Sequence, residues 1–183
     1  REELITKGYS FTSNTDTEVI LYAFIEWGED CLSKFNGMWS FGIFDLKENK
    51  VFFSRDRYGI KPFYYYQDNE RIIYASEIQA ILAILPKNKI TINNNELFDY
   101  IVFNRTDQTE RTFYNGIKKM LHGHSMLIKN NNIRKKRWYR LEENIENPFK
   151  DKDEYLETLI SSVNIRLRSD VPVGLSLSGG IDS

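Results

Sequence analysis

The stretch that most constrains the fold is "VGLSLSGGIDS", residues 173–183. An alternating apolar segment runs directly into two adjacent glycines, which lie between small hydroxyl residues and are followed by an acid. Glycines let a backbone bend sharply and approach a ligand closely, and the amide groups freed at such a turn point toward an anion. Because a strong helical pattern over 153–170 precedes this segment, the order of helix, strand and glycine loop predicts the start of an α/β domain.

The glycine loop differs from two familiar phosphate-binding motifs. No Gly-Lys-Ser/Thr follows the glycines, so the loop is not a Walker A motif, and a G-x-G-x-x-G fingerprint is absent. Ser178 and Ser183 add hydroxyl donors, and Asp182 suits a phosphate site in which Mg²⁺ lies between the acid and the phosphate. The alternative explanation is an ordinary strand-to-helix turn capped by serine.

Residues 1–141 carry a different pattern, in which short strand pairs alternate with helices. Apolar residues spaced for one buried face predict a helix over 15–27, with Thr15 and Glu18 as a capping pair and Gly28 as its end. Because antiparallel strands with helices on one face are typical of an α+β domain, we predict that residues 1–141 form such a domain. The other predicted elements are helices at 76–85 and 94–104 and hairpins that pair 38–46 with 51–56, 62–67 with 71–76, and the two halves of 124–141 around three asparagines.

Beyond this domain, the polar and aperiodic stretch 142–152 predicts a linker. The helix predicted over 153–170 has a regular apolar face. Asp151 and Glu154 are spaced to form its capping pair.

Charge and composition exclude several classes of protein. The formal net charge is -1, from 25 basic and 26 acidic residues, so no excess charge favours binding to nucleic acid or membranes. No apolar run is long enough to span a bilayer. Cys31 is the single cysteine, so an intramolecular disulfide is impossible, and we expect a packed small side chain in a cytoplasmic protein. The sequence lacks an initiator Met, and we expect it to be part of a longer protein at both ends.

Three other stretches favour structural roles. The basic and aromatic run 133–140 is short, and a solvated strand face explains it better than a nucleic-acid site. His122 and His124 are too isolated to predict a metal site. The tyrosines at 64–66 fit a strand with one buried and one exposed face better than a binding platform.

Several motifs together resemble one family. "SGGIDS" resembles the pyrophosphate loop of the ATP pyrophosphatase superfamily, and "RSDVPVGLSL" before it resembles the glutamine-dependent asparagine synthetases. "SNTDTEVILYAFIEWGEDCLSKFNGMWSFGIFDLKENKVFFSRDRYGIKPFYYY" and "IYASEIQAIL" resemble the glutaminase domain of those enzymes, in the same order. The resemblance implies part of an N-terminal-nucleophile hydrolase αββα sandwich over 1–141, the linker 142–152, and at 153–183 the start of an α/β domain of the adenine nucleotide alpha hydrolase type.

The resemblance also implies an activity. In this family an amino-terminal cysteine releases ammonia from glutamine, and ATP activates aspartate as an adenylate that the ammonia attacks to give asparagine. We expect that cysteine upstream of Arg1, so this stretch alone should be inactive. The alternatives are a related amidotransferase with another acceptor, a ligase similar to β-lactam synthetase, and a non-catalytic nucleotide-binding homologue.

The resemblance assigns site residues through the matched motifs. Asp16 corresponds to the acid that holds the α-amino group of glutamine, although an acid there also suits a helix N-terminus. Arg55, Asp56, Gly59 and Pro62 keep the family pattern and fit a structural corner beside the glutamine site, in which the charges of Arg55 and Asp56 are partly paired. The alternative is a direct role in substrate binding. The expected partners are glutamine, aspartate and ATP with Mg²⁺, without nucleic acid or membrane, and a homodimer is compatible with the resemblance. The ATP and pyrophosphate residues are Ser176 (usually apolar in the family), Leu177, Ser178, Gly179, Gly180, Asp182 and Ser183, with Asp182 also the Mg²⁺ ligand.

Overall fold

The computed structural model describes residues 1–130, 132–143, 145 and 148–180. The chain forms two compact units, Arg1–Arg140 and Leu141–Ser183, which are described separately. In the described part of the chain, no helix is long and apolar enough to cross a membrane.

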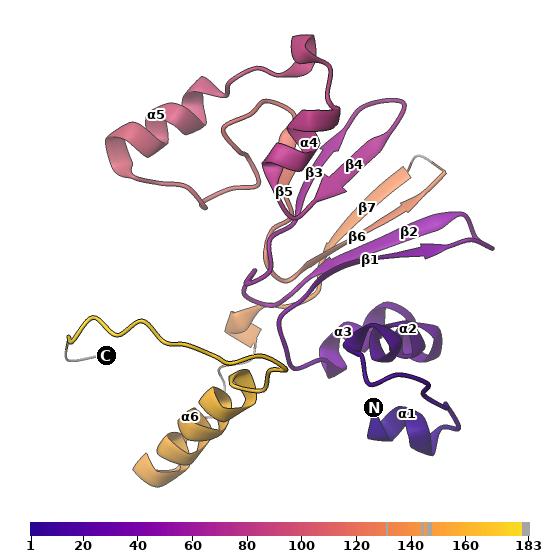
Figure 1. Ribbon diagram of the computed structural model, residues 1–183, viewed down its shortest axis with the longest axis vertical. Helices are drawn as coiled ribbons and strands as arrows, with labels where there is room; N and C mark the ends of the chain where they lie inside the picture. Colours follow the sequence, from indigo (N-terminus) through magenta and orange to yellow (C-terminus); the bar gives the residue numbers. More distant parts are fainter. Residues whose placement is uncertain (131, 144, 146–147, 181–183) are drawn as a thin grey trace. The chain divides into compact units, whose positions relative to one another are not determined.

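Two antiparallel sheets form the body of the first unit (Figure 1). One has the strand order β1-β2-β6-β7 and the other β4-β3-β5. All three predicted hairpins are confirmed, as β1 with β2, β3 with β4, and β6 with β7. The strands are β1 (Ser40–Asp45), β2 (Lys50–Arg55), β3 (Tyr64–Gln67), β4 (Ile72–Ala75), β5 (Ile117–Lys119), β6 (His124–Lys129) and β7 (Asn132–Arg137).

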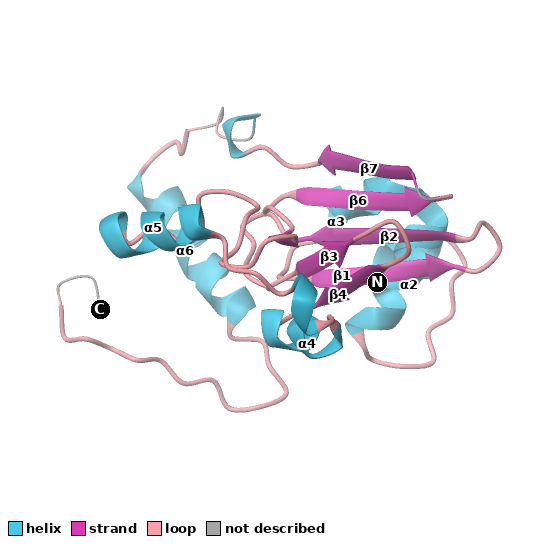
Figure 2. Ribbon diagram, turned by 90° about the horizontal axis from the view of Figure 1, so that it is seen from above, coloured by secondary structure: helices cyan, strands magenta, loops and turns pink. Residues whose placement is uncertain are grey.

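Helices cover the outer faces of the two sheets. Figure 2 shows α2 and α3 behind the sheet that contains β1 and β2, and α4 packs against β3 and β4 of the other sheet. The predicted helices at 15–27, 76–85 and 94–104 are confirmed with small changes at their ends. The helices of this unit are α1 (Glu2–Thr6), α2 (Asp16–Trp27), α3 (Cys31–Lys34), α4 (Ile78–Ile84) and α5 (Asn94–Phe103), with 3₁₀ turns at Gly28–Asp30 and Lys87–Lys89.

Three apolar cores separate these layers. Phe52 and Phe53 are neighbours on β2, so their side chains point to opposite faces of the sheet, and both are almost fully buried. Phe52 lies in the core beneath α2 and α3, whereas Phe53 lies between the two sheets. The third core joins Ile81 of α4 to Ile117 of β5. The order helix, sheet, sheet, helix is therefore an αββα sandwich.

The start of α2 differs from its predicted capping pair. Thr15 is the N-cap residue, but its side chain makes no capping hydrogen bond. Glu18 instead accepts hydrogen bonds from the amides of Thr12 (2.9 Å) and Ser13 (2.8 Å), and from the Ser13 hydroxyl (2.7 Å). The glutamate therefore ties the preceding loop to the helix, while the Thr15 hydroxyl shares a hydrogen bond of 2.9 Å with the Ser13 hydroxyl instead of capping the helix.

The second unit contains a 3₁₀ turn at Leu141–Glu143 and α6 (Lys152–Arg166). The capping pair is confirmed, because the Asp151 carboxylate accepts the Glu154 amide at 2.9 Å. The strand predicted within 173–177 is not formed. No backbone of the described residues pairs with this stretch, and a strand needs such a partner for its amide and carbonyl groups.

Candidate functional site

A cavity of about 290 Å³, here named the α2 cavity, opens beside the first turns of α2. Asp16, Val19 and Ile20 of α2 form one wall. The segment 34–39, which runs from the end of α3 to β1, forms another wall, and Arg1 completes the lining. The lining thus combines apolar side chains with a few polar and charged ones, of which Asp16 is the single carboxylate, and this is the composition of a small polar-ligand site.

Asp16 is the first residue of α2, directly after its N-cap. Its carboxylate accepts no hydrogen bond and forms no ion pair with any residue that the structure describes. It therefore makes no capping bond to the helix amides. The carboxylate remains available to bind a cation in the α2 cavity.

The two cationic side chains of the α2 cavity are engaged elsewhere. The guanidinium of Arg1 donates to the Ser13 carbonyl at 2.6 Å. The ammonium of Lys34 pairs with Glu3 at 2.7 Å. Neither of them neutralises Asp16, so an ammonium ligand would meet an uncompensated carboxylate.

The corner between β2 and β3 supports the far end of segment 34–39. Asp56 is 1% exposed, and its carboxylate accepts the Trp39 amide at 3.3 Å. Arg55 donates to the carbonyls of Gly59, Lys61 and Met120. The structural role predicted for this corner is confirmed. The predicted partial pairing of the two charges is present only as an interaction through space, in which burial, the larger effect, lowers the pKa of Arg55 and the Asp56 charge raises it. Among the described residues Arg55 and Asp56 form no ion pair, because each binds backbone groups instead.

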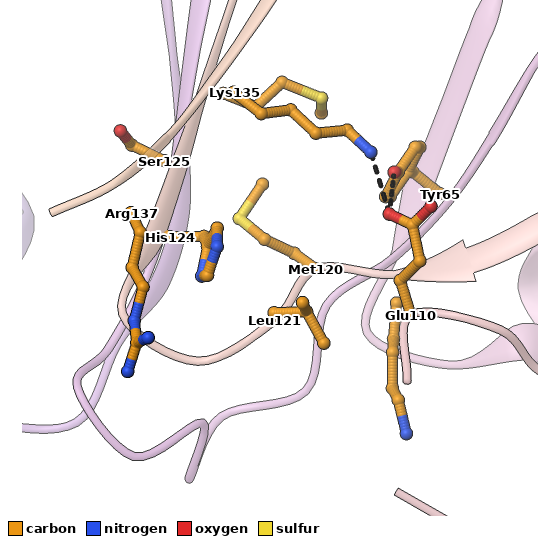
Figure 3. A pocket seen from close by; sticks show the side chains of 10 residues that line it. Tyr65, Glu110, Met120, Leu121, His124, Ser125, Lys135 and Arg137 are labelled. Atoms are coloured by element: carbon orange, nitrogen blue, oxygen red, sulfur yellow. Dashed lines mark hydrogen bonds and ion pairs between the residues drawn. The ribbon is translucent and has the colours of Figure 1, made fainter. Parts of the chain in front are cut away.

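A second cavity has a volume of about 190 Å³ (Figure 3). It is lined in part by Tyr65, His124 and Lys135, which belong to the stretches for which the sequence favoured structural roles. Lys135 pairs with Glu110 at 2.8 Å, and the Tyr65 hydroxyl donates to the same carboxylate at 3.4 Å. Burial lowers the pKa of His124, whose Nδ1 lies 2.8 Å from the His122 carbonyl. The sequence offered no signal for Glu110, which lies far from its partners along the chain. Glu110 and Lys135 neutralise each other, so this cluster favours a structural role over a ligand-binding one.

The glycine loop lies in the second unit, and the structure describes residues 176–180 of this loop. Asp182 and Ser183 lie outside the described residues. Gly179 has φ +76°, and a Cβ there would meet nothing within 4 Å. The Gly180 amide donates to the Ser178 hydroxyl at 3.4 Å, and all five residues are exposed. The positive φ at Gly179 is a conformation that favours glycine, and it lets the backbone turn sharply at this point of the predicted loop.

The single cysteine of the chain lies outside both cavities. Cys31 is 0% exposed, and burial together with the Asp30 charge raises the pKa of its thiol to about 12. The prediction that Cys31 is a packed side chain is therefore confirmed. Within the described ranges, no group of three His, Cys, Asp or Glu side chains could hold a metal ion.

The layered fold has a counterpart among solved structures. Glutamine phosphoribosylpyrophosphate amidotransferase from B. subtilis superposes with a TM-score of 0.50, at 16% identity, over 75% of this chain and 26% of that chain. With the αββα order, this assigns the first unit to part of an N-terminal-nucleophile hydrolase fold. Residues 1–139 match the glutamine amidotransferase domain family, and residues 154–183 match the asparagine synthase family. The chain belongs to the glutamine amidotransferase family.

Curated relatives align with all or nearly all of the chain. A putative glutamine-hydrolysing asparagine synthetase 2 of Methanocaldococcus jannaschii is 41% identical over 177 residues, which are 93% of this chain and 34% of the relative. Glutamine-hydrolysing asparagine synthetase 3 of Bacillus subtilis is 35% identical over 185 residues, covering 100% of this chain and 30% of the relative. Amidase chry2 of Gibberella zeae is 29% identical over 96% of this chain and 26% of the relative. The chain thus spans about a third of these relatives or less.

Proposed function

We propose that the intact protein containing this chain is a glutamine-hydrolysing asparagine synthetase. It would release ammonia from L-glutamine and use ATP to convert L-aspartate into L-asparagine through β-aspartyl-AMP, leaving L-glutamate, AMP and pyrophosphate. The match of residues 1–139 and 154–183 to two family models, in that order, supports both half-reactions.

The unpartnered carboxylate of Asp16 in the α2 cavity carries the glutamine half of the proposal. An α-ammonium group is the cation that an amino-acid substrate brings, and a charge-assisted hydrogen bond to a carboxylate suits it. Asp16 would orient glutamine for attack by the cysteine expected upstream of Arg1. Positioning of this kind lowers the entropic barrier of the reaction.

The glycine loop supports the ATP half. Ser178, Gly179 and Gly180 would hold phosphate oxygens, with Ser176 and Leu177 facing adenosine. Ser183 would add a hydroxyl donor. Asp182 would hold Mg²⁺, which when bound supplies charge stabilisation for the leaving pyrophosphate.

The test uses the intact protein, ATP, Mg²⁺ and glutamine with a panel of amino-acid acceptors. Pyrophosphate, AMP and glutamate are measured for each acceptor. Pyrophosphate release that depends on aspartate, with matching glutamate formation, is the expected result. A protein that does not respond to aspartate is not an asparagine synthetase, and ATP binding without AMP formation would identify a non-catalytic homologue.

A second candidate function is an amidotransferase that acts on a different acceptor. The similarity to amidase chry2 favours this candidate. That relative aligns with 96% of this chain, but its name describes an amidase and not an asparagine synthetase. Glutamate formation coupled to an acceptor other than aspartate in the same panel would support this candidate.

A further inference from the structure

Arg57 connects the β2–β3 corner to the end of α3. Its Nη2 donates to the Ser33 carbonyl at 3.1 Å, and its Nη1 donates to the Phe35 carbonyl. The carbonyls at the end of a helix lack partners within the helix, so they need donors from elsewhere. The planar guanidinium supplies two donors with fixed spacing and thereby fixes the backbone at the point where α3 ends.

Three aromatic rings surround the same guanidinium. Its central carbon lies 5.7 Å from the ring centroid of Trp39, 5.2 Å from that of Trp138 and 5.3 Å from that of Tyr139. The two indoles stack with centroids 5.5 Å apart and an interplanar angle of 21°. Cation–π attraction and packing therefore limit the orientations that Arg57 can adopt.

Segment 34–39 is thus held at both ends by consecutive residues. Arg57 binds the carbonyls at its α3 end, and Asp56 binds the Trp39 amide at its β1 end. This segment forms a wall of the α2 cavity, which Asp16 also lines. Arg57 does not itself line the cavity, so it can affect a ligand there only by fixing the position of the wall.

We propose that Arg57 is a positioning residue that fixes the glutamine-facing wall of the α2 cavity. The inference rests on the proposed function, which places glutamine in this cavity. When the guanidinium is lost, segment 34–39 should sample positions that no longer match the substrate opposite Asp16. Glutamine binding should weaken, while chemistry that does not use this cavity should be unaffected.

The experiment compares Arg57→Gln and Arg57→Lys with wild type in the intact protein. Each enzyme is assayed for glutamate formation across glutamine concentrations, and for AMP formation with ammonium chloride in place of glutamine. Arg111→Gln is the matched control, because Arg111 also donates to a protein acceptor, Glu96, but lies outside the α2 cavity. Ammonia-driven AMP formation reports the ATP half-reaction independently of the glutamine site, and thermal unfolding of each variant reports the folding of the first unit, which contains Arg57.

The expected result is a KM for glutamine raised about tenfold in Arg57→Gln, with the loss of a charged hydrogen-bond donor as its cause. Arg57→Lys should lie between this variant and wild type, because an ammonium keeps the charge near the rings but cannot reproduce the two-donor geometry. Ammonia-driven AMP formation should be unchanged in both variants, and Arg111→Gln should match wild type in both assays.

Two results would overturn the inference while the proposed function stands. One is an unchanged KM for glutamine in both Arg57 variants of an enzyme that hydrolyses glutamine. The other is an equal loss of glutamine-driven and ammonia-driven activity in both variants, which would show a general structural role. A wild-type protein that forms AMP with ammonia but does not hydrolyse glutamine would instead overturn the glutamine half of the proposed function.

Discussion

The backbone of Trp39 is bound to Asp56 by two opposed hydrogen bonds. The Trp39 amide donates to the Asp56 carboxylate at 3.3 Å, and the Asp56 amide donates to the Trp39 carbonyl at 3.0 Å. The indole of Trp39 also donates to the Ser54 hydroxyl at 3.1 Å. The entry into β1 is therefore fastened to the end of β2 through both backbone and side-chain groups.

Replacement of Asp56 by asparagine should lower the free energy of unfolding by about 2–4 kcal/mol. The buried carboxylate accepts several backbone amides. The side-chain amide of asparagine is a weaker acceptor, and its NH₂ group would face one of these donors. Besides Trp39, the carboxylate accepts the amides of Tyr58, Ile60 and Lys61. Urea unfolding measures the change. Asp45→Asn is the control, because the Asp45 carboxylate also accepts two backbone amides but lies at the partly exposed end of β1. It should cost less than about 1 kcal/mol. Equal losses in the two variants would contradict the role assigned to Asp56.

Replacement of Asp16 by asparagine should separate ligand binding from helix capping. Asp16 makes no capping hydrogen bond, so stability should change by less than about 0.5 kcal/mol. The KM for glutamine should rise at least about tenfold, because a neutral amide loses the charge-assisted bond to the ammonium group. Thermal unfolding and glutamate assays of the intact protein test both parts. A large loss of stability with an unchanged KM would assign Asp16 to the helix.

Local patterns predicted most of the elements of the first unit. The apolar spacing of α2 and the turn residues of the three hairpins act over a few positions, so they are visible in the sequence. Strand β5 has three residues, too few for a pattern, and its pairing with β3 depends on residues about fifty positions apart. The capping pair at α2 shows another limit of sequence patterns. The residue type identified Thr15 as the N-cap, but the pattern did not show that Glu18 binds the loop at residues 12–13 instead of Thr15.

The candidate site was predicted only in part for the same reason. Motif resemblance selected Asp16, but another wall of its cavity comes from segment 34–39. Arg57 reaches that wall across 22 positions of sequence, at the Phe35 carbonyl. No periodicity records such a contact, because it arises from the packing of α3 against the β2–β3 corner. Asp182 and Ser183 lie outside the described residues, and their roles stay predictions.

Glu18 should make stability depend on acid pH. Hydrogen bonds from Ser13 and Thr12 lower the pKa of its carboxyl from 4.5 to about 2. A carboxyl with a lowered pKa stabilises the fold above its unfolded pKa, and that contribution is lost as the pH falls from about 4.5 toward about 2. Melting temperatures of wild type should therefore fall more steeply through this window than those of Glu18→Gln.

The control for this pH series is Glu70→Gln, since the Glu70 side chain accepts no hydrogen bond from the described residues. Its melting curve should follow that of wild type at each pH. Parallel pH dependence of Glu18→Gln and wild type would show that the bonds to the 12–13 loop do not favour the ionised carboxylate.

Gly123 and Gly8 form a matched pair for testing close backbone packing. Both have positive φ, +63° and +94°, so alanine is strained at either position. At Gly123 an added Cβ would also lie 2.9 Å from the Tyr139 carbonyl oxygen, whereas at Gly8 it would meet nothing within 4 Å. Gly123→Ala should cost about 2–4 kcal/mol and Gly8→Ala about 1 kcal/mol in urea unfolding. Equal losses of unfolding free energy in the two variants would mean that backbone strain explains the loss at Gly123 and that the close contact with Tyr139 adds nothing.

Cys31 should be inert in the folded protein despite the cysteine chemistry of its family. Burial, with the Asp30 charge, raises the thiol pKa from 9.0 to about 12, so the nucleophilic thiolate is scarce at neutral pH. Because the folded pKa is raised, the stability linked to the neutral thiol is complete below about pH 9 and is lost as the pH rises toward about 12. A thiol reagent such as dithionitrobenzoate at pH 8 should label Cys31 only after denaturation. Rapid labelling of the native protein would show that α3 opens far more readily than a thiol with 0% exposure implies.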